Sequence, residues 1–313
     1  MTDISAGRRQ TIADLTWNSD YSVVGVFPSP DRRYIALSLQ GYEGDTPLWL
    51  VNADGTGARF LMIGVFIGWA PDSTKIYVNR IGGRVGIQEV SIIAGTSRYL
   101  IEEYAIDPAL SPDGQKIAFS SFQSGPGKSW ILGISDLSKS AITKTSYFAN
   151  SEFAWSPDSR KLAFTVLGRD DTNFYHAGEL WMVDSDGKNP VRLSKEGEQD
   201  FDPDWSPDGR MLAYAHREAA SDEASMEDPM NIVSSIWILD PVGQIRESVI
   251  GANGVGNMAP QWSPDSNKIA YIAKRGASSE IYLWDAVNGT MEQISAGPIS
   301  ITGGRHAPLN WVQ

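Results

Sequence analysis

The sequence predicts an all-β fold, a six-bladed β-propeller with four antiparallel strands in each blade. Three observations lead to this prediction. A short turn motif recurs six times at a spacing close to the length of one blade. Each copy is followed by segments that alternate apolar and polar residues, which is typical of half-buried strands. No segment shows an apolar period of ~3.6 residues with helix caps at both ends.

The turn motif is most regular as "WSPDG" at 205–209 and as "WSPDS" at 155–159 and 262–266. Looser copies occur at 28–32, 69–73 and 110–114. The Pro-Asp pairs start at positions 30, 71, 112, 157, 207 and 264, so successive copies are 41, 41, 45, 50 and 57 residues apart. A repeat of ~40–45 residues matches one four-stranded blade.

Four strands are expected in each repeat. A short apolar segment that leads into the turn motif forms the first strand, and the second strand follows the turn at 33–38, 75–79, 116–120, 161–165, 211–215 and 268–272. The third strand is expected at 48–52, 87–91, 129–134, 180–184, 236–240 and 281–285. Many of these third strands run into Asp, Gly and Asn turn residues. A fourth strand closes each repeat, for example at 58–63, 97–102 and 190–195.

The turn motif itself is predicted to be structural. Ser-Pro-Asp-Gly suits a β-turn, because Pro fits the second position and Asp accepts hydrogen bonds from nearby backbone amides. A base follows the Asp in most copies, so we expect a local ion pair with Arg33, Lys75, Lys116, Lys161 and Lys268. The Trp before the Ser is expected to pack between neighbouring blades. A catalytic group is needed once, whereas this motif recurs in every repeat.

The complete repeat, with "WSPDG" (205–209), "KIAFS" (116–120) and "LWMVDSDG" (180–187), resembles the PD40, or WD40-like, repeat of TolB-like β-propellers. The resemblance spans residues 22–295 and implies a TolB-like six-bladed propeller. Proteins with this propeller include the periplasmic translocation protein TolB and peptidases of the prolyl-oligopeptidase and tricorn-like types. No catalytic residue is carried over, and the sequence contains no G-x-S-x-G nucleophile motif.

One propeller domain is therefore expected at 22–295, preceded by an N-terminal segment at 1–21 and followed by a C-terminal closing segment at 296–313. The stretch "RRQTIADL" resembles a fourth strand, and "HAPLNWV" resembles a first strand. Propellers often close by joining strands from both termini, which protects their edges. Six blades are favoured over a partial seventh.

Composition excludes several classes of function. The formal net charge of −12 and the pI of about 4.7 disfavour nucleic acid and anionic membrane surfaces as partners. The absence of cysteine excludes disulfides, thiolate metal sites and a cysteine nucleophile. No apolar run is long enough to cross a bilayer. The N-terminal stretch shows no signal peptide, so the expected location is cytoplasmic as the sequence stands, and periplasmic or secreted if a signal has been removed.

Acidic residues before the first strands are candidate binding residues. Asp107, Glu152, Asp200, Asp202 and Asp204 are expected at the mouth of the central channel. Because alternate residues of a strand share a side, the last three are predicted to converge. Such a group would suit Ca²⁺, or the basic side chains of a protein partner. The alternative is a set of solvated loop acids.

Long loops on the same face are the second candidate feature, at 167–179 and 216–235. Long loops on a rigid scaffold commonly bind ligands, although a tolerated insertion is the alternative. Contact residues are expected in the first of these loops and near the C-terminus: Phe174, Tyr175, His176, Arg305 and His306.

The preferred interpretation is a monomeric, non-catalytic binding propeller whose partner is a protein or peptide, with no cofactor apart from a possible Ca²⁺ ion. The alternative is a metal-assisted hydrolase or lyase acting on a sugar or lactone. It requires His176, His216 or His306 to lie near the acids. A further alternative is the accessory propeller of a peptidase.

Overall fold

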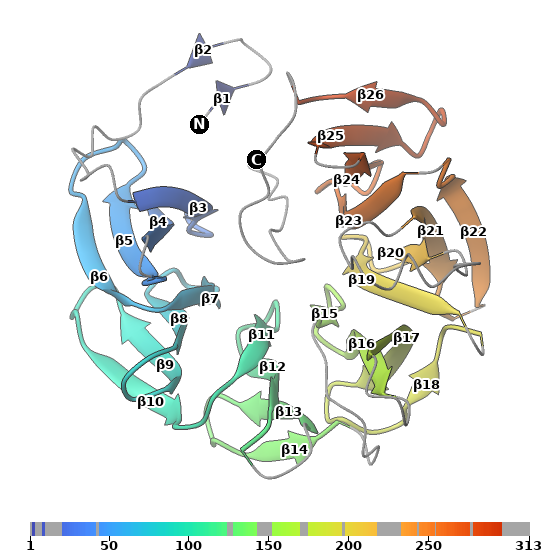
Figure 1. The fold of residues 1–313 in the computed structure, drawn as a ribbon. Coiled ribbons are helices and arrows are strands. Elements are labelled where there is room, and N and C mark those ends of the chain that lie inside the picture. The colour runs from blue at the N-terminus through green and yellow to red at the C-terminus, as the bar shows by residue number, and fades with distance from the viewer. Residues whose placement is uncertain are drawn as a thin grey trace. The chain divides into compact units, whose positions relative to one another are not determined.

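The computed structural model describes residues 2–3, 8–9, 21–41, 44–123, 128–142, 152–169, 175–195, 198–217, 233–242, 244–253, 255–275 and 278–295. All regular elements within these ranges are β-strands, as the arrows in Figure 1 show. The strands fall into two compact units, Met1–Tyr104 and Ala105–Trp311, which are described separately.

The first unit contains two four-stranded antiparallel sheets and one short strand pair. The first sheet consists of β3 (Tyr21–Pro28), β4 (Tyr34–Gly41), β5 (Pro47–Asn52) and β6 (Arg59–Ile63). The second sheet consists of β7 (Val65–Trp69), β8 (Lys75–Arg80), β9 (Gly86–Ser91) and β10 (Ser97–Ile101). The strands β1 (Thr2–Asp3) and β2 (Arg8–Arg9) pair with each other.

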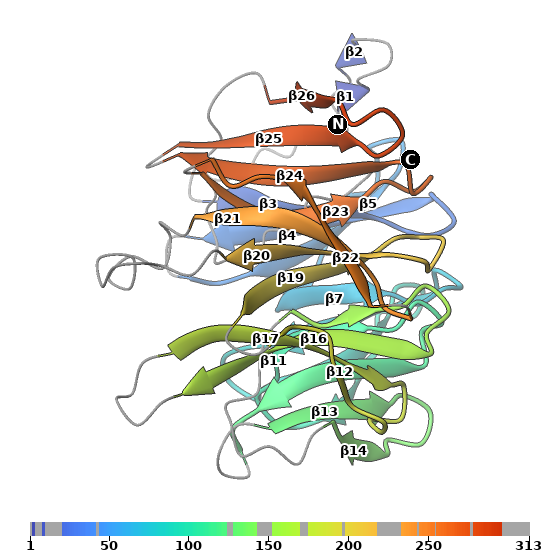
Figure 2. The same ribbon diagram turned by 90° about the vertical axis from the view of Figure 1, so that its right-hand side faces the viewer.

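The second unit contains four further groups of four antiparallel strands. The first two are β11 (Ile106–Leu110), β12 (Lys116–Ser121), β13 (Lys128–Gly133) and β14 (Lys139–Ala141), then β15 (Ala154–Trp155), β16 (Lys161–Arg169), β17 (Tyr175–Asp184) and β18 (Val191–Arg192). The last two are β19 (Gln199–Trp205), β20 (Leu212–Arg217), β21 (Ser234–Asp240) and β22 (Ile245–Ile250), then β23 (Gly256–Trp262), β24 (Lys268–Arg275), β25 (Ser278–Asp285) and β26 (Met291–Gln293). In the last group β24 and β25 lie side by side (Figure 2).

A single parallel pair of residues, Ser234 and Gly256, joins the last two groups into one eight-stranded sheet. Two groups in the first unit and four in the second agree with the six repeats of the sequence. The antiparallel order within each group follows the chain order, as expected for blades.

The hairpin of β16 and β17 is longer than the sequence predicts. The stretch 167–179 was expected to be a loop, but the two strands stay paired as far as Arg169 and Tyr175. A register shift between Val166 and Gly168 keeps the ladder continuous past the expected strand end. Only 170–174 lies outside the described residues here.

The Ser-Pro-Asp turns are held by their own side chains. In the first turn, Ser29 Oγ donates to Asp31 Oδ1 at 2.7 Å, and the same carboxylate oxygen accepts the backbone N–H of Arg33 at 3.0 Å. Four later turns repeat the Ser-to-Asp contact, from Ser111, Ser156, Ser206 and Ser263. This confirms a structural role for the motif in these turns.

The expected ion pair between the turn Asp and the following base forms in the first turn, where Arg33 Nε lies 2.6 Å from Asp31 Oδ2. Two of the other bases bind elsewhere: Lys75 pairs with Glu89 at 3.2 Å, and Lys161 pairs with Asp184 at 2.5 Å. These lysines begin a strand, and their long side chains reach a carboxylate on the neighbouring strand.

The tryptophans of the motif pack between adjacent groups, as expected. Trp155 Nε1 donates to the backbone oxygen of Ala109 at 3.1 Å, and Trp205 Nε1 donates to that of Ala154 at 3.1 Å. In the first unit Trp69 makes the same contact with Phe27. The apolar cores likewise combine residues of two successive groups, for example Ala118, Ile131, Leu162 and Phe164. Within each unit, these contacts therefore pack one group against the next.

The closing segments were expected at 1–21 and 296–313. Within the first, the described residues form the β1–β2 pair and the first residue of β3, and the second lies outside the described residues. In the described ranges no helix has the length and apolar character needed to span a membrane.

Candidate functional site

The acids of β19 do not form one converging row. The pairing of β19 with β20 shifts register between Phe201 and Asp204, and Asp202 has a positive φ of 54°. This bulge interrupts the alternation that would place Asp200, Asp202 and Asp204 on one side of the strand. Asp200 and Asp202 are buried, with exposed fractions of 1% and 8%.

The carboxylates of Glu152 and Asp202 bind the backbone of the next group. Glu152 Oε2 accepts the backbone N–H of Asp202 at 2.7 Å, and it also accepts the hydroxyl of Thr165 at 2.9 Å. Asp202 Oδ2 in turn accepts the backbone N–H of Ala259 at 2.9 Å. The three linked positions are equivalent in successive groups. Glu152 and Asp202 therefore have a structural role that the sequence analysis did not identify.

A sequence signal for this role was present. Asp107, Glu152, Asp202 and Ala259 each stand four residues before the Ser of a Ser-Pro-Asp turn. All four have positive φ, between 45° and 74°. Aspartate tolerates this left-handed conformation better than most residues. The recurrence of acids at one position of the repeat indicates a repeated backbone contact.

Asp204 differs from its neighbours because it faces a hollow. Its Oδ2 accepts the backbone N–H of Trp262 at 2.7 Å. The residue is half-buried, and desolvation raises the pKa of its carboxyl from 3.8 to about 7, although the hydrogen bond from Trp262 acts in the opposite direction. At neutral pH this carboxyl is therefore close to half ionised.

The hollow has a volume of about 420 Å³. Its lining consists of prolines and aromatic side chains with one small apolar residue, one carboxyl and one amide: Pro112, Pro157, Pro203, Pro207, Phe153, Trp155, Trp205, Ala154, Asp204 and Gln261. Three of the prolines belong to Ser-Pro-Asp turns, so the hollow lies at the turn ends of the strands. A mostly apolar lining with few polar groups is typical of a binding site.

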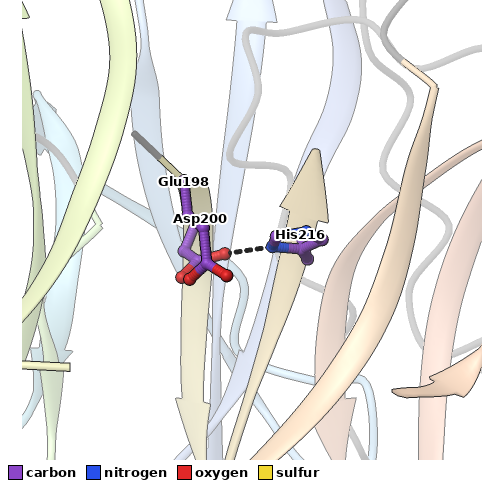
Figure 3. A group of neighbouring side chains, drawn as sticks. All are labelled: Glu198, Asp200 and His216. Atoms are coloured by element: carbon purple, nitrogen blue, oxygen red, sulfur yellow. Dashed lines mark hydrogen bonds and ion pairs between the residues drawn. The ribbon is translucent and has the colours of Figure 1, made fainter. Parts of the chain in front are cut away.

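A second polar cluster lies at the other end of β19, where Glu198, Asp200 and His216 meet (Figure 3). Asp200 Oδ1 lies 2.6 Å from His216 Nδ1, and its Oδ2 accepts the hydroxyl of Ser194 at 2.8 Å. Candidate ligand atoms of Glu198, Asp200 and His216 lie within 4.8 Å of one another. His216 was one of three histidines that the enzyme interpretation required near the acids.

Arg246 supplies a cation that contacts both carboxylates of this cluster. Its guanidinium hydrogen-bonds Glu198 Oε2 and the hydroxyl of Tyr214, and it lies 3.5 Å from Asp200 Oδ2. Burial raises the pKa of Glu198, but the hydrogen bond from Arg246 and a backbone N–H outweigh this, so the pKa is lowered overall. A divalent cation bound by these carboxylates would compete with the guanidinium. The arrangement therefore favours a buried ion-pair cluster over a metal centre.

Several candidate residues belong neither to the hollow at Asp204 nor to the polar cluster around Asp200. Asp107 is half-buried in β11. Tyr175 and His176 begin β17, opposite Arg169 and Gly168, and their side chains are outside the described part of the chain. Phe174, Arg305, His306 and the loop residues 218–232 are also outside it.

The repeated sheets, the inter-sheet tryptophans and the bulged first strands define a β-propeller protein. The family described as TolB beta propeller domain matches residues 97–216 and 176–308. The chain therefore belongs to the TolB-like propellers built from PD40 repeats.

Comparison with individual proteins gives the same result. The chain is 33% identical over 117 residues to the Tol-Pal system protein TolB of Alcanivorax borkumensis. The aligned stretch covers 37% of this chain and 24% of that protein. The crystal structure of TolB from Acinetobacter baumannii is similar with a TM-score of 0.56 and 18% identity, over 90% of this chain and 65% of that one. An oligogalacturonate lyase in complex with manganese is similar with a TM-score of 0.66 and 14% identity, over 86% of this chain and 75% of that one. The chain spans less than a quarter of the first curated TolB proteins that it matches, at 23% and 24% of their lengths.

Proposed function

We propose that this chain is a non-catalytic binding propeller whose partner is a protein of the Tol-Pal system. The observation that carries the proposal is the hollow of about 420 Å³, which combines an apolar lining with the carboxyl of Asp204. Family membership supports it, because the curated relatives named above include Tol-Pal system proteins. Under this proposal the function requires no cofactor.

Of the three acids of β19 that were expected to contact the partner, this proposal assigns that role to one. Asp204 faces the hollow and is retained as a contact residue. Asp200 and Asp202 are buried in contacts within the chain, so under this proposal they stabilise the fold and do not contact the partner. The formal net charge of −12 favours a partner with basic groups at the contact.

The lyase alternative has weaker support. The lyase alternative requires a histidine near the acids, and His216 lies beside Asp200. One solved structure with this fold is a lyase in complex with manganese. However, a likeness at 14% identity extends to the fold alone, and Arg246 already pairs with both carboxylates beside His216.

Isothermal titration calorimetry of the purified chain with the soluble Tol-Pal proteins of the same organism tests the proposal. One of them should bind. The variant Gln261→Lys, which places a cation in the hollow beside Asp204, should weaken that binding at least about tenfold. The matched control Gln293→Lys changes an exposed residue of β26 and should leave binding unchanged. Absence of binding by every Tol-Pal protein, or equal affinities for the two variants, would refute the proposal.

A further inference from the structure

We infer that the hollow binds one cationic side chain, a lysine or arginine of the protein partner, with its apolar stem against the aromatic and proline lining and its charged head at Asp204. This inference rests on the proposed function and deepens it, since it specifies the chemistry of one contact residue. Nothing in the family relationship assigns this contact.

The carboxyl of Asp204 has no counter-ion among the described residues. It is the only charged side chain in the lining of the hollow. Among the described residues no lysine or arginine pairs with it, and desolvation and one backbone hydrogen bond account for its electrostatic environment. A carboxylate in such surroundings is stabilised strongly by a cation that arrives with a ligand.

The rest of the lining selects an organic cation over a metal ion. Ca²⁺ takes six to eight oxygen ligands, whereas the lining side chains offer one carboxylate and the amide of Gln261. Lysine and arginine combine a long apolar stem with a charged head. Phe153, Trp155 and Trp205 with the surrounding prolines provide apolar contact for that stem, and the volume of about 420 Å³ accommodates it.

Cation binding in this hollow is linked to proton release. Because the carboxyl has a pKa of about 7 without a ligand, it is partly protonated at neutral pH. A bound cation favours the ionised form and lowers this pKa. Asp204 is the only titratable side chain of the lining, so affinity for the cation should rise between pH 5.5 and pH 8.

The test uses Nα-acetyl-lysine N-methylamide as the probe and its norleucine analogue, which lacks the ammonium group, as the matched ligand. Saturation-transfer NMR titration gives both dissociation constants for the purified chain. At pH 8 the lysine probe should bind at least about fivefold more tightly than the norleucine probe, and this preference should shrink at pH 5.5.

Two variants assign the preference to the hollow. Asp204→Asn should abolish it, while the amide oxygen of Asn can still accept the N–H of Trp262, and a melting curve verifies the fold. Asp208→Asn, which changes a turn carboxyl outside the lining, should retain it. Equal binding of the two probes to the unmodified chain, or a preference that survives Asp204→Asn, would overturn the inference.

The two proposals fail in different ways. If a Tol-Pal protein binds the unmodified chain and Asp204→Asn equally well, the binding function stands and the cation contact is wrong. If the lysine probe binds as expected but no Tol-Pal protein does, the cation site stands and the proposed function is wrong.

Discussion

Replacing Arg246 by Met tests the cluster at the start of β19. The guanidinium is 9% exposed and contacts two carboxylates, of which Asp200 is 1% exposed and Glu198 is 24% exposed. Methionine fills a similar volume but leaves both carboxylates without their cation. Breaking a buried ion pair by removing one partner costs about 3–5 kcal/mol. Because solvent partly screens Glu198, we expect a loss of about 3 kcal/mol.

The matched control is Arg210→Met in the same unit. The Arg210 side chain is 83% exposed, and its Nε lies 3.7 Å from Asp208 Oδ2. Exposed ion pairs of this kind contribute about 0–1 kcal/mol. Chemical denaturation at pH 7 should therefore separate the two variants clearly, and the melting temperature of Arg246→Met should fall by about 5 °C.

The pH dependence gives an independent check on the cause. In the unmodified chain the lowered pKa of Glu198 contributes stability above its unfolded pKa, and this is lost as pH falls through the folded value. Without Arg246, burial dominates and raises the folded pKa above the unfolded one. The deficit of Arg246→Met should then shrink as pH falls from 7 to 5. A loss below about 1 kcal/mol, equal to that of Arg210→Met, would refute the account of this cluster.

Three further outcomes are expected. Glu152→Ala should cost about 1–3 kcal/mol in denaturation experiments, because the backbone N–H of Asp202 loses its acceptor; a loss within error of zero would contradict the contact. The pKa of the Asp204 carboxyl is raised to about 7 in the folded chain, so the unmodified chain loses stability as pH rises from 4 to 7. Asp204→Asn should remove about 3 kcal/mol of that decline, and parallel pH profiles of the two chains would contradict this account. EDTA should leave the melting temperature unchanged, because Asp200, Asp202 and Asp204 already bind donors of the chain; a clear decrease would restore the Ca²⁺ interpretation.

The sequence predicted the repeated part of this protein well. The Ser-Pro-Asp turns and the alternating strands depend on local chemistry and on a repeat period that is visible in the sequence. The order of the strands and the packing of the tryptophans between sheets could therefore be predicted. The expectation for the acids of β19 was less accurate. Alternation along a strand assumes regular pairing, and the bulge at Asp202 breaks it.

Other features depend on contacts that are distant in the sequence. Arg246 reaches Glu198 from 48 residues away, and nothing in the sequence near either residue indicates the partner. The hollow requires three turns and three first strands to meet, which only the packed second unit specifies. The elongated β16–β17 hairpin was missed because 167–179 was interpreted as a long loop between the second and third strands of its repeat.

The hydrogen bonds from Glu152 to Asp202 and from Asp202 to Ala259 have a consequence for how such chains diversify. Each carboxylate fixes the starting point of the following sheet directly, whatever length of chain connects them. Insertions between these anchors can therefore accumulate without disturbing alignment, as the steps of 50 and 57 residues between the anchored positions indicate. Recombination that duplicates, removes or exchanges a whole repeat would keep the anchoring intact, provided that each junction carries an acid at this position.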